Sequence, residues 1–95
     1  MTDTPEGRVT LAVIQSDIRH LTALLEEHRP AFGPNDERIL GLRHQIGLLQ
    51  WPCGEHDAAR LGLRELHDHL VRLRSADDPL TRRVGADVER YARRS

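Results

Sequence analysis

Four stretches of this chain repeat apolar residues at intervals of three and four, and turn-forming residues separate them. The stretches cover residues 9–29, 36–50 and 56–74, and the last begins at Pro79. Intervals of three and four place side chains on one side of an α-helix, because the helix turns once in about 3.6 residues. No stretch alternates apolar and polar residues over the length of a strand. The sequence therefore predicts an all-α fold of four helices arranged as antiparallel helical hairpins.

Proline and acidic residues mark the predicted ends of these helices. Pro30 is expected to end the first helix, since a proline inside a helix removes a backbone hydrogen bond and crowds the preceding turn. Asn35 or Asp36 is expected to cap the second helix, because either side chain can accept from the free N–H groups of a first turn. Asp78, followed by Pro79 at the first helical position, predicts the start of the fourth helix.

Each helix is predicted to turn one stripe of apolar side chains toward a common core. The stripes consist of Leu11, Ile14, Ile18, Leu21 and Leu25; Ile39, Leu42, Ile46 and Leu49; Ala59, Leu63, Leu66, Leu70 and Leu73; and Leu80, Val84, Val88 and Tyr91. Other large apolar residues lie outside these stripes, namely Val9, Val13, Leu24, Leu40, Leu48 and Trp51. They either broaden the core or form an exposed apolar surface, which usually marks an interface. Trp51 is the better interface candidate, because tryptophan is enriched among binding anchors.

The chain has 95 residues, enough for one domain, which we assign to residues 8–95 after a flexible N-terminal segment, residues 1–7. The formal net charge is -1, with 14 basic and 15 acidic residues, so no overall field draws the chain to nucleic acid or to a membrane. Cys53 is the only cysteine, which excludes an intrachain disulfide and favours the cytoplasm. No apolar run approaches the roughly 18 residues of a membrane span.

The two halves of the chain match at an offset of 42 residues. Leu21 falls on Leu63, and Ile46 falls on Val88, so core positions meet core positions. A fixed period of about 20 to 50 residues in a helical chain is typical of a solenoid, in which each hairpin buries its apolar face against the next. The sequence therefore predicts stacked hairpins, with one complete hairpin flanked by two single helices.

Two short segments carry a resemblance to a known repeat family. Residues 43–47 read RHQIG and residues 54–59 read GEHDAA, within the stretch LLEEHRPAFGPNDERILGLRHQIGLLQWPCGEHDAAR. This stretch resembles the 42-residue variant of the tetratricopeptide repeat that occurs in kinesin light chains and in bacterial signalling proteins. The resemblance implies that Gly47 is the small residue that lets two helices approach closely. It also implies that Gln45 stands where the family usually has a peptide-contacting asparagine.

The same resemblance implies that the first helix of each hairpin, here residues 36–50 and the helix after Pro79, lines a groove for a partner. The predicted partner-binding residues are Arg38, Gln45, Leu48, Trp51, Arg83, Asp87 and Arg90. An amide can donate to and accept from a peptide backbone, and arginine pairs with carboxylates through two parallel hydrogen bonds. The alternative is that these residues form ordinary solvated helix faces.

No combination of residues predicts catalysis, a cofactor or a metal site. Cys53 and His56 have the spacing of two zinc ligands across a turn, but no second pair accompanies them. The sequence has no glycine-rich phosphate loop and no assembled nucleophile and base. We therefore expect no catalytic residues and no metal or other cofactor.

The sequence favours a non-enzymatic protein–protein interaction module that binds a partner protein or peptide, with a homodimer as one form of that association. Two alternatives stay open. Residues 72–94 contain seven arginines, which suits nucleic acid, although no recognition-helix motif accompanies them. A small metal-binding helical enzyme is the other alternative.

Overall fold

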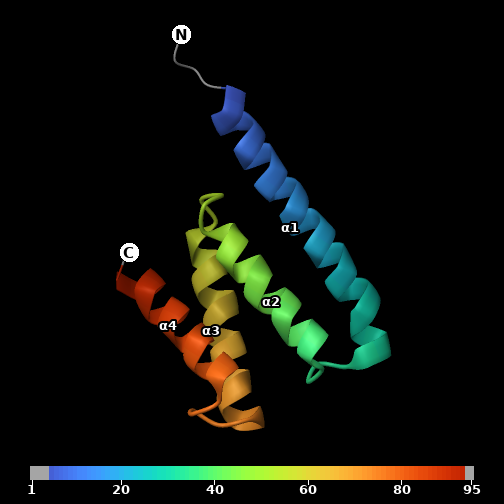
Figure 1. Ribbon diagram of the computed structural model, residues 1–95, viewed down its shortest axis with the longest axis vertical. Coiled ribbons are helices and arrows are strands. Elements are labelled where there is room, and N and C mark those ends of the chain that lie inside the picture. The colour runs from blue at the N-terminus through green and yellow to red at the C-terminus, as the bar shows by residue number, and fades with distance from the viewer. Residues whose placement is uncertain (1–4, 94–95) are drawn as a thin grey trace.

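The computed structural model describes the backbone of residues 5–93 and the side chains of residues 11–93. The helices are α1 (Pro5–Phe32), α2 (Glu37–Gln50), α3 (His56–Leu73) and α4 (Pro79–Arg93), and residues 5–93 contain no strand. Consecutive helices run antiparallel, and each packs chiefly against the next (Figure 1). The structure therefore confirms the all-α fold of antiparallel helical hairpins. No helix within the described residues is long and apolar enough to cross a membrane.

Helix α1 is longer than predicted at both ends. It begins at Pro5, so residues 5–7, which were assigned to a flexible segment, are helical, while residues 1–4 lie outside the described part. The prediction that Pro30 ends the helix is wrong, because the helix continues through this proline to Phe32. The end is set by Gly33, whose φ of 82° is a left-handed conformation that glycine adopts without a steric penalty. The N–H of Gly33 donates to the Arg29 carbonyl oxygen at 2.9 Å.

Of the two candidate caps of α2, Asp36 is the one that caps the helix, and the predicted Asp78 cap of α4 is confirmed. Asp36 Oδ1 accepts from the backbone N–H of Arg38 at 2.9 Å, and the Arg38 guanidinium donates to both oxygens of the same carboxylate. These side-chain and backbone hydrogen bonds from Arg38 lower the pKa of Asp36 to about 2. Asp78 Oδ2 accepts from the backbone N–H groups of Leu80 at 3.0 Å and Thr81 at 3.3 Å. Each cap satisfies N–H groups that the first turn of a helix leaves unpaired.

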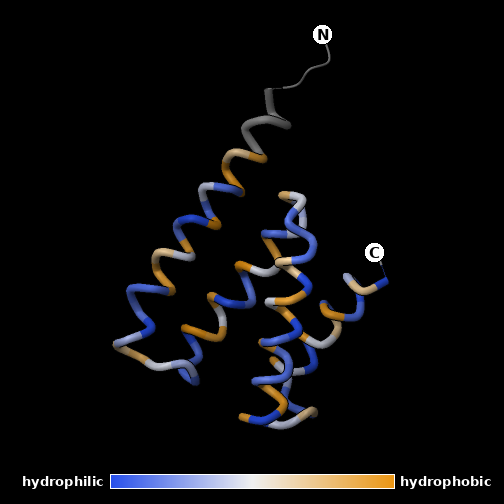
Figure 2. The backbone as a smooth tube through the Cα atoms, turned by 180° about the vertical axis from the view of Figure 1, so that it is seen from behind, coloured by the Kyte–Doolittle hydropathy of each residue, from blue (hydrophilic) through white to orange (hydrophobic). Residues whose placement is uncertain are grey.

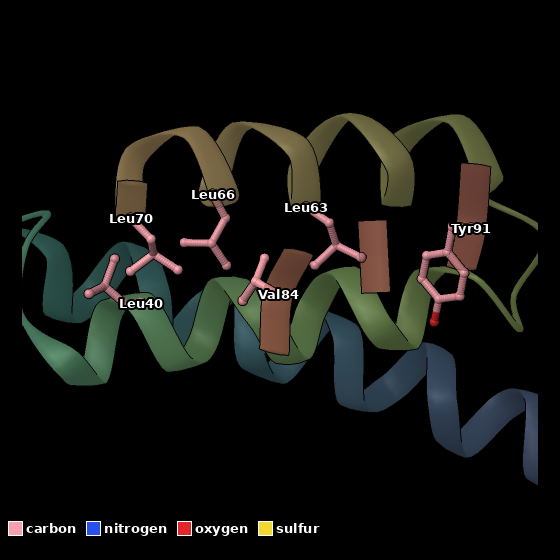
Figure 3. Close-up of a cluster of buried hydrophobic side chains, with 6 residues drawn as sticks. All are labelled: Leu40, Leu63, Leu66, Leu70, Val84 and Tyr91. Atoms are coloured by element: carbon pink, nitrogen blue, oxygen red, sulfur yellow. The ribbon is translucent and has the colours of Figure 1, made fainter. Parts of the chain in front are cut away.

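The main core lies between α2, α3 and α4. Figure 3 shows three leucines of α3 pointing toward side chains from the two neighbouring helices. The buried cluster comprises Leu40, Leu63, Leu66, Leu70, Val84 and Tyr91. The predicted stripe of α3 is confirmed at Ala59, Leu63, Leu66 and Leu70 but is wrong at Leu73, which is 39% exposed. The predicted inward positions of α4 are confirmed, with Leu80 and Val88 partly buried against the cluster.

Helix α2 buries its predicted stripe only in part and buries a second face that was not predicted. Leu40 lies outside the predicted core stripe, yet it is fully buried in the cluster. Of the predicted stripe, Ile39 is buried, whereas Leu42, Ile46 and Leu49 are only half-buried. The reason is that α2 packs against α1 on one side and against α3 on another, so its apolar surface is divided between two neighbours. One stripe cannot describe a helix with two packing faces.

Gly47 confirms the expected close approach of two helices. A Cβ atom at this position would lie 2.7 Å from both Cγ and Cδ2 of Leu63, closer than non-bonded carbon atoms can approach. The backbone of α2 is therefore pressed against the leucine stripe of α3. A glycine is required here by packing, since its own backbone is ordinary helix.

Candidate functional site

A groove runs between α1 and α2 on one side of the molecule. It consists of two hollows of about 380 and 360 Å³ that share Gln45. From α1 the groove is lined by Asp17, Leu21, Leu24 and His28. From α2 it is lined chiefly by Arg38, Gly41, Gln45 and Leu48. Both sets follow the spacing of three and four residues that places side chains on one face of a helix, so two stripes face each other across the groove.

The structure thus brings together three of the predicted partner-binding residues, Arg38, Gln45 and Leu48. Gln45 is exposed at the junction of the two hollows, and Leu48 is partly buried against the core below. Arg38 lies at one end, held by Asp36 and stacked over the Phe32 ring with its guanidinium carbon 3.5 Å from the ring centre. Gln45 is the member of this group whose polar side chain has no partner within the described residues.

Gly41 keeps the middle of the groove open. A Cβ atom at this position would meet no other atom within 4 Å, so the groove is unfilled above the helix backbone. Leucines from both helices form an apolar floor there, while Asp17, His28 and Arg38 provide polar margins. An apolar floor with polar margins is the usual composition of a protein-binding surface.

The groove continues into an apolar part of α1 that extends beyond the other helices. Asp17 and Leu21 lie opposite the end of α2, and the segment that precedes them projects past it (Figure 1). Leu11 is 42% exposed and Val13 is 49% exposed. The prediction that Leu11 belongs to the core is therefore wrong, and Figure 2 shows this part of α1 carrying apolar positions away from the body of the molecule. The side chain of Val9 lies outside the described part.

Trp51 joins the end of α2 to α4. Its ring stacks on the Tyr91 ring with a centroid distance of 4.2 Å and an angle of 8° between the planes, and on the His56 ring at 4.2 Å. The guanidinium of Arg60 lies 5.4 Å from its centre. Trp51 is half-buried and packs against the core cluster, so much of the surface expected to anchor a partner is used inside the fold.

Asp87 lies inside the protein instead of on a partner-binding face. It is buried, and its Oδ2 atom lies 2.8 Å from Nε2 of His44, so an N–H of the imidazole donates to the carboxylate. The Arg90 guanidinium binds its other oxygen and lies 5.2 Å from the centre of the Tyr91 ring. Both oxygens of Asp87, which the sequence predicts to contact a partner, are therefore occupied within the fold. Arg90 itself remains exposed.

Sequence reasoning missed His44. The residue lies four positions after Leu40 and three before Gly47, and all three are buried on the same side of α2. The spacing of three and four was present in the sequence. A search for apolar residues does not detect it, because two of its three members are a histidine and a glycine. Arg83, the remaining predicted site residue, is exposed and lines a separate hollow with Glu37 and Arg74, away from the α1–α2 groove.

Among the residues that the structure describes, no group of three or more histidine, cysteine, aspartate or glutamate side chains is placed to hold a metal ion. Cys53 is a half-buried free thiol, and the ring of His56 stacks on Trp51. No protein-family model, curated protein or solved structure matches the chain. The tetratricopeptide resemblance therefore rests on the chain's own residues.

Proposed function

We propose that this chain is a non-enzymatic protein–protein interaction module that binds a helical segment of a partner protein. The observation that carries the proposal is the exposed apolar part of α1, with Leu11 and Val13, which continues into the α1–α2 groove. Burying one such side chain stabilises a complex by up to about 1.5 to 3 kcal/mol. A helix laid along α1 would cover this surface as α2 covers the second half of α1.

The groove suits an amphipathic helix better than an extended chain. Its two walls are stripes of side chains on α1 and α2. Its floor is apolar over about three helical turns, between Leu24 of α1 and Leu48 of α2. A partner helix that follows α1 presents its own apolar side chains at the same spacing of three and four. Gln45 can then donate to and accept from polar groups at the margin of the partner. In the tetratricopeptide frame, α2 is the first helix of the complete hairpin, which is where that family binds its partners.

We place this activity in the cytoplasm, as a docking module in a larger assembly, with a second copy of the chain as one partner that would satisfy the same groove. The support is compositional: Cys53 is the only cysteine, and the chain carries almost balanced charge. Balanced charge favours a partner bound through apolar contact rather than one held by a long-range field.

A selection of helical peptides displayed on phage tests the proposal. Peptides selected on the wild-type protein should bind Gly41→Leu at least roughly tenfold more weakly, because the new side chain fills the middle of the groove. Gly62→Leu is the matched control: a Cβ there also meets no atom within 4 Å, but Gly62 lies on α3 outside the groove. Both changes replace a helical glycine with a better helix former, so neither should lower the melting temperature.

The proposal fails if no peptide is enriched, or if the selected peptides bind both glycine variants with equal affinity. Labelled duplex DNA provides the comparison for the arginine-rich alternative. Strong DNA binding that falls steeply with added salt, in the absence of any selected peptide, would replace the protein-binding function with a nucleic-acid-binding one.

A further inference from the structure

A second hollow lies on the other side of α2, where α1, α2 and α3 meet. Its volume is about 310 Å³. Arg29 and Arg43 line it together with Glu65, and apolar side chains including Leu25 and Leu61 form the rest of the wall. We call it the basic hollow. It shares no lining residue with the α1–α2 groove.

Arg43 is exceptional among the half-buried arginines. Arg60 is paired with Asp57, and Arg74 with Glu37, whereas Arg43 has no hydrogen bond or ion pair with any side chain of residues 11–93. Burial lowers the pKa of the Arg43 guanidinium, and the positive charge of Arg29 lowers it further. The negative charge of Glu65 opposes this effect but is the smallest of the three influences. The Arg43 guanidinium has thus lost part of its hydration and has only a weak counter-charge, so a bound anion would relieve this cost.

The positive charge extends beyond the hollow along α3. The pKa of His69 is lowered by burial and then by the charges of Arg43 and Arg72, which shows that both cations lie within electrostatic reach of His69. Glu65 is the acidic residue in the lining, and it is exposed and forms no ion pair with Arg29 or Arg43 within the described residues. Two guanidinium groups thus share one acidic neighbour.

An exposed apolar surface adjoins these cations. Leu61 is 58% exposed, more than any other large hydrophobic side chain described, and it lines the hollow with Leu25 and Ile46. A ligand that satisfies both parts carries an anionic group for the guanidiniums and an apolar group for the leucines. An acidic peptide side chain beside a leucine has this composition. Nucleic acid does not, because no aromatic ring lines the hollow for bases to stack upon.

We propose that the basic hollow binds an acidic peptide segment, with Arg43 and Arg29 holding an aspartate or glutamate carboxylate while an adjacent apolar side chain packs on Leu61. Arginine recognises carboxylates through paired N–H donors, and such charge-assisted bonds are stronger than neutral ones. The site is independent of the α1–α2 groove and takes a different ligand. A partner that binds both the basic hollow and the α1–α2 groove would contact α2 on two sides.

An array of short synthetic peptides tests this site. Each peptide carries one glutamate and one leucine at separations of one to four residues, and a second array replaces the glutamate with glutamine. We expect the wild-type protein to bind glutamate peptides at least roughly tenfold more tightly than their glutamine counterparts. Arg43→Gln and Arg29→Gln should each lose a similar factor. Arg82→Gln should not, because Arg82 is an exposed arginine on α4 whose loss changes the net charge equally.

Two glycine variants separate this site from the α1–α2 groove. Gly62 lines the basic hollow in open space, so Gly62→Leu should abolish binding of the glutamate peptides without altering any charge, whereas Gly41→Leu should leave it unchanged. Melting temperatures confirm that each variant folds. The proposal is overturned if no glutamate peptide binds, if Arg82→Gln weakens binding as much as Arg43→Gln, or if Arg43-dependent binding is found only with labelled single-stranded DNA.

Discussion

Gly47 and Gly41 lie on the same helix in opposite surroundings. A Cβ atom at Gly47 would lie 2.7 Å from Leu63, whereas one at Gly41 would meet no atom within 4 Å. We therefore expect Gly47→Ala to lower the free energy of unfolding by about 1 to 3 kcal/mol through overpacking. Gly41→Ala should raise it by up to about 1 kcal/mol, because alanine loses less backbone entropy in a helix. Urea unfolding followed by circular dichroism measures both changes.

The pair isolates packing from helix propensity, because both substitutions gain the same propensity in the same helix. If Gly47→Ala proved as stabilising as Gly41→Ala, the close contact between α2 and α3 would be wrong. Gly85 provides an intermediate case. A Cβ atom there would lie 2.9 Å from Nε2 of His67, at the end of a side chain that can rotate away.

At the scale of single residues, the sequence predicted the positions that lie on one stripe of a helix. It missed the positions that are buried because a second face of the same helix is also covered. Gln45 and Leu48 lie in the groove because their spacing alone places them on one stripe. Leu40 and His44 are buried because α3 and α4 cover a second face of the same helix. Asp87 was misplaced for the same reason, since its partner His44 lies 43 positions away in the chain.

At the scale of elements, local chemistry predicted where helices begin better than where they end. Asp36 and Asp78 cap their helices through bonds that span two or three residues, so the sequence contains all the information. Pro30 was a poorer guide, because a proline near a helix end removes one hydrogen bond without forcing the chain out of the helix. The left-handed Gly33 supplies the actual end.

The cap of α4 can be tested against its neighbour in the chain. Asp78 accepts two backbone N–H groups, while the adjacent Asp77 is exposed and forms no hydrogen bond within the described residues. Asp78→Ala should lower the free energy of unfolding by about 1 kcal/mol, the usual cost of losing such a cap. Asp77→Ala removes the same charge and should change stability little. Equal effects of the two substitutions, measured by thermal unfolding, would show that charge rather than capping matters here.

At the scale of the whole molecule, the helices form an open row instead of a closed bundle. The chain measures 51 × 33 × 20 Å along its principal axes, and α1 has 28 residues where its neighbour α2 has 14. At about 1.5 Å per residue, α1 is about twice as long as the helix that covers it. The repeat of 42 residues predicted that the helices stack in a row, but it did not predict that α1 extends beyond α2. Periodicity gives the order of the helices and does not determine which turns of one helix contact the next.

The two ends of the row are held differently. Helix α4 is tied back to α2 by the Asp87–His44 bond and by the stacking of Tyr91 on Trp51. Helix α1 packs chiefly against α2, and the first half of its described length has no comparable tie. Local opening requires least free energy where buried contacts are fewest. The row should therefore open first at α1.

Native-state hydrogen exchange followed by nuclear magnetic resonance tests this order of opening. Among residues 11–93, we expect the amides of residues 11–16 to exchange fastest within the helices, and those near Leu66 in the middle of α3 to exchange slowest, at the rate of global unfolding. Tyr91→Ala should accelerate exchange in α4 while leaving residues 11–16 unchanged, since it removes contacts of α4 with Trp51 and with the core cluster. Slow exchange of residues 11–16 in dilute protein would contradict the prediction that the row of helices opens first at α1. Slow exchange that appears only at high protein concentration or with a bound peptide would instead identify the exposed half of α1 as the surface that association covers.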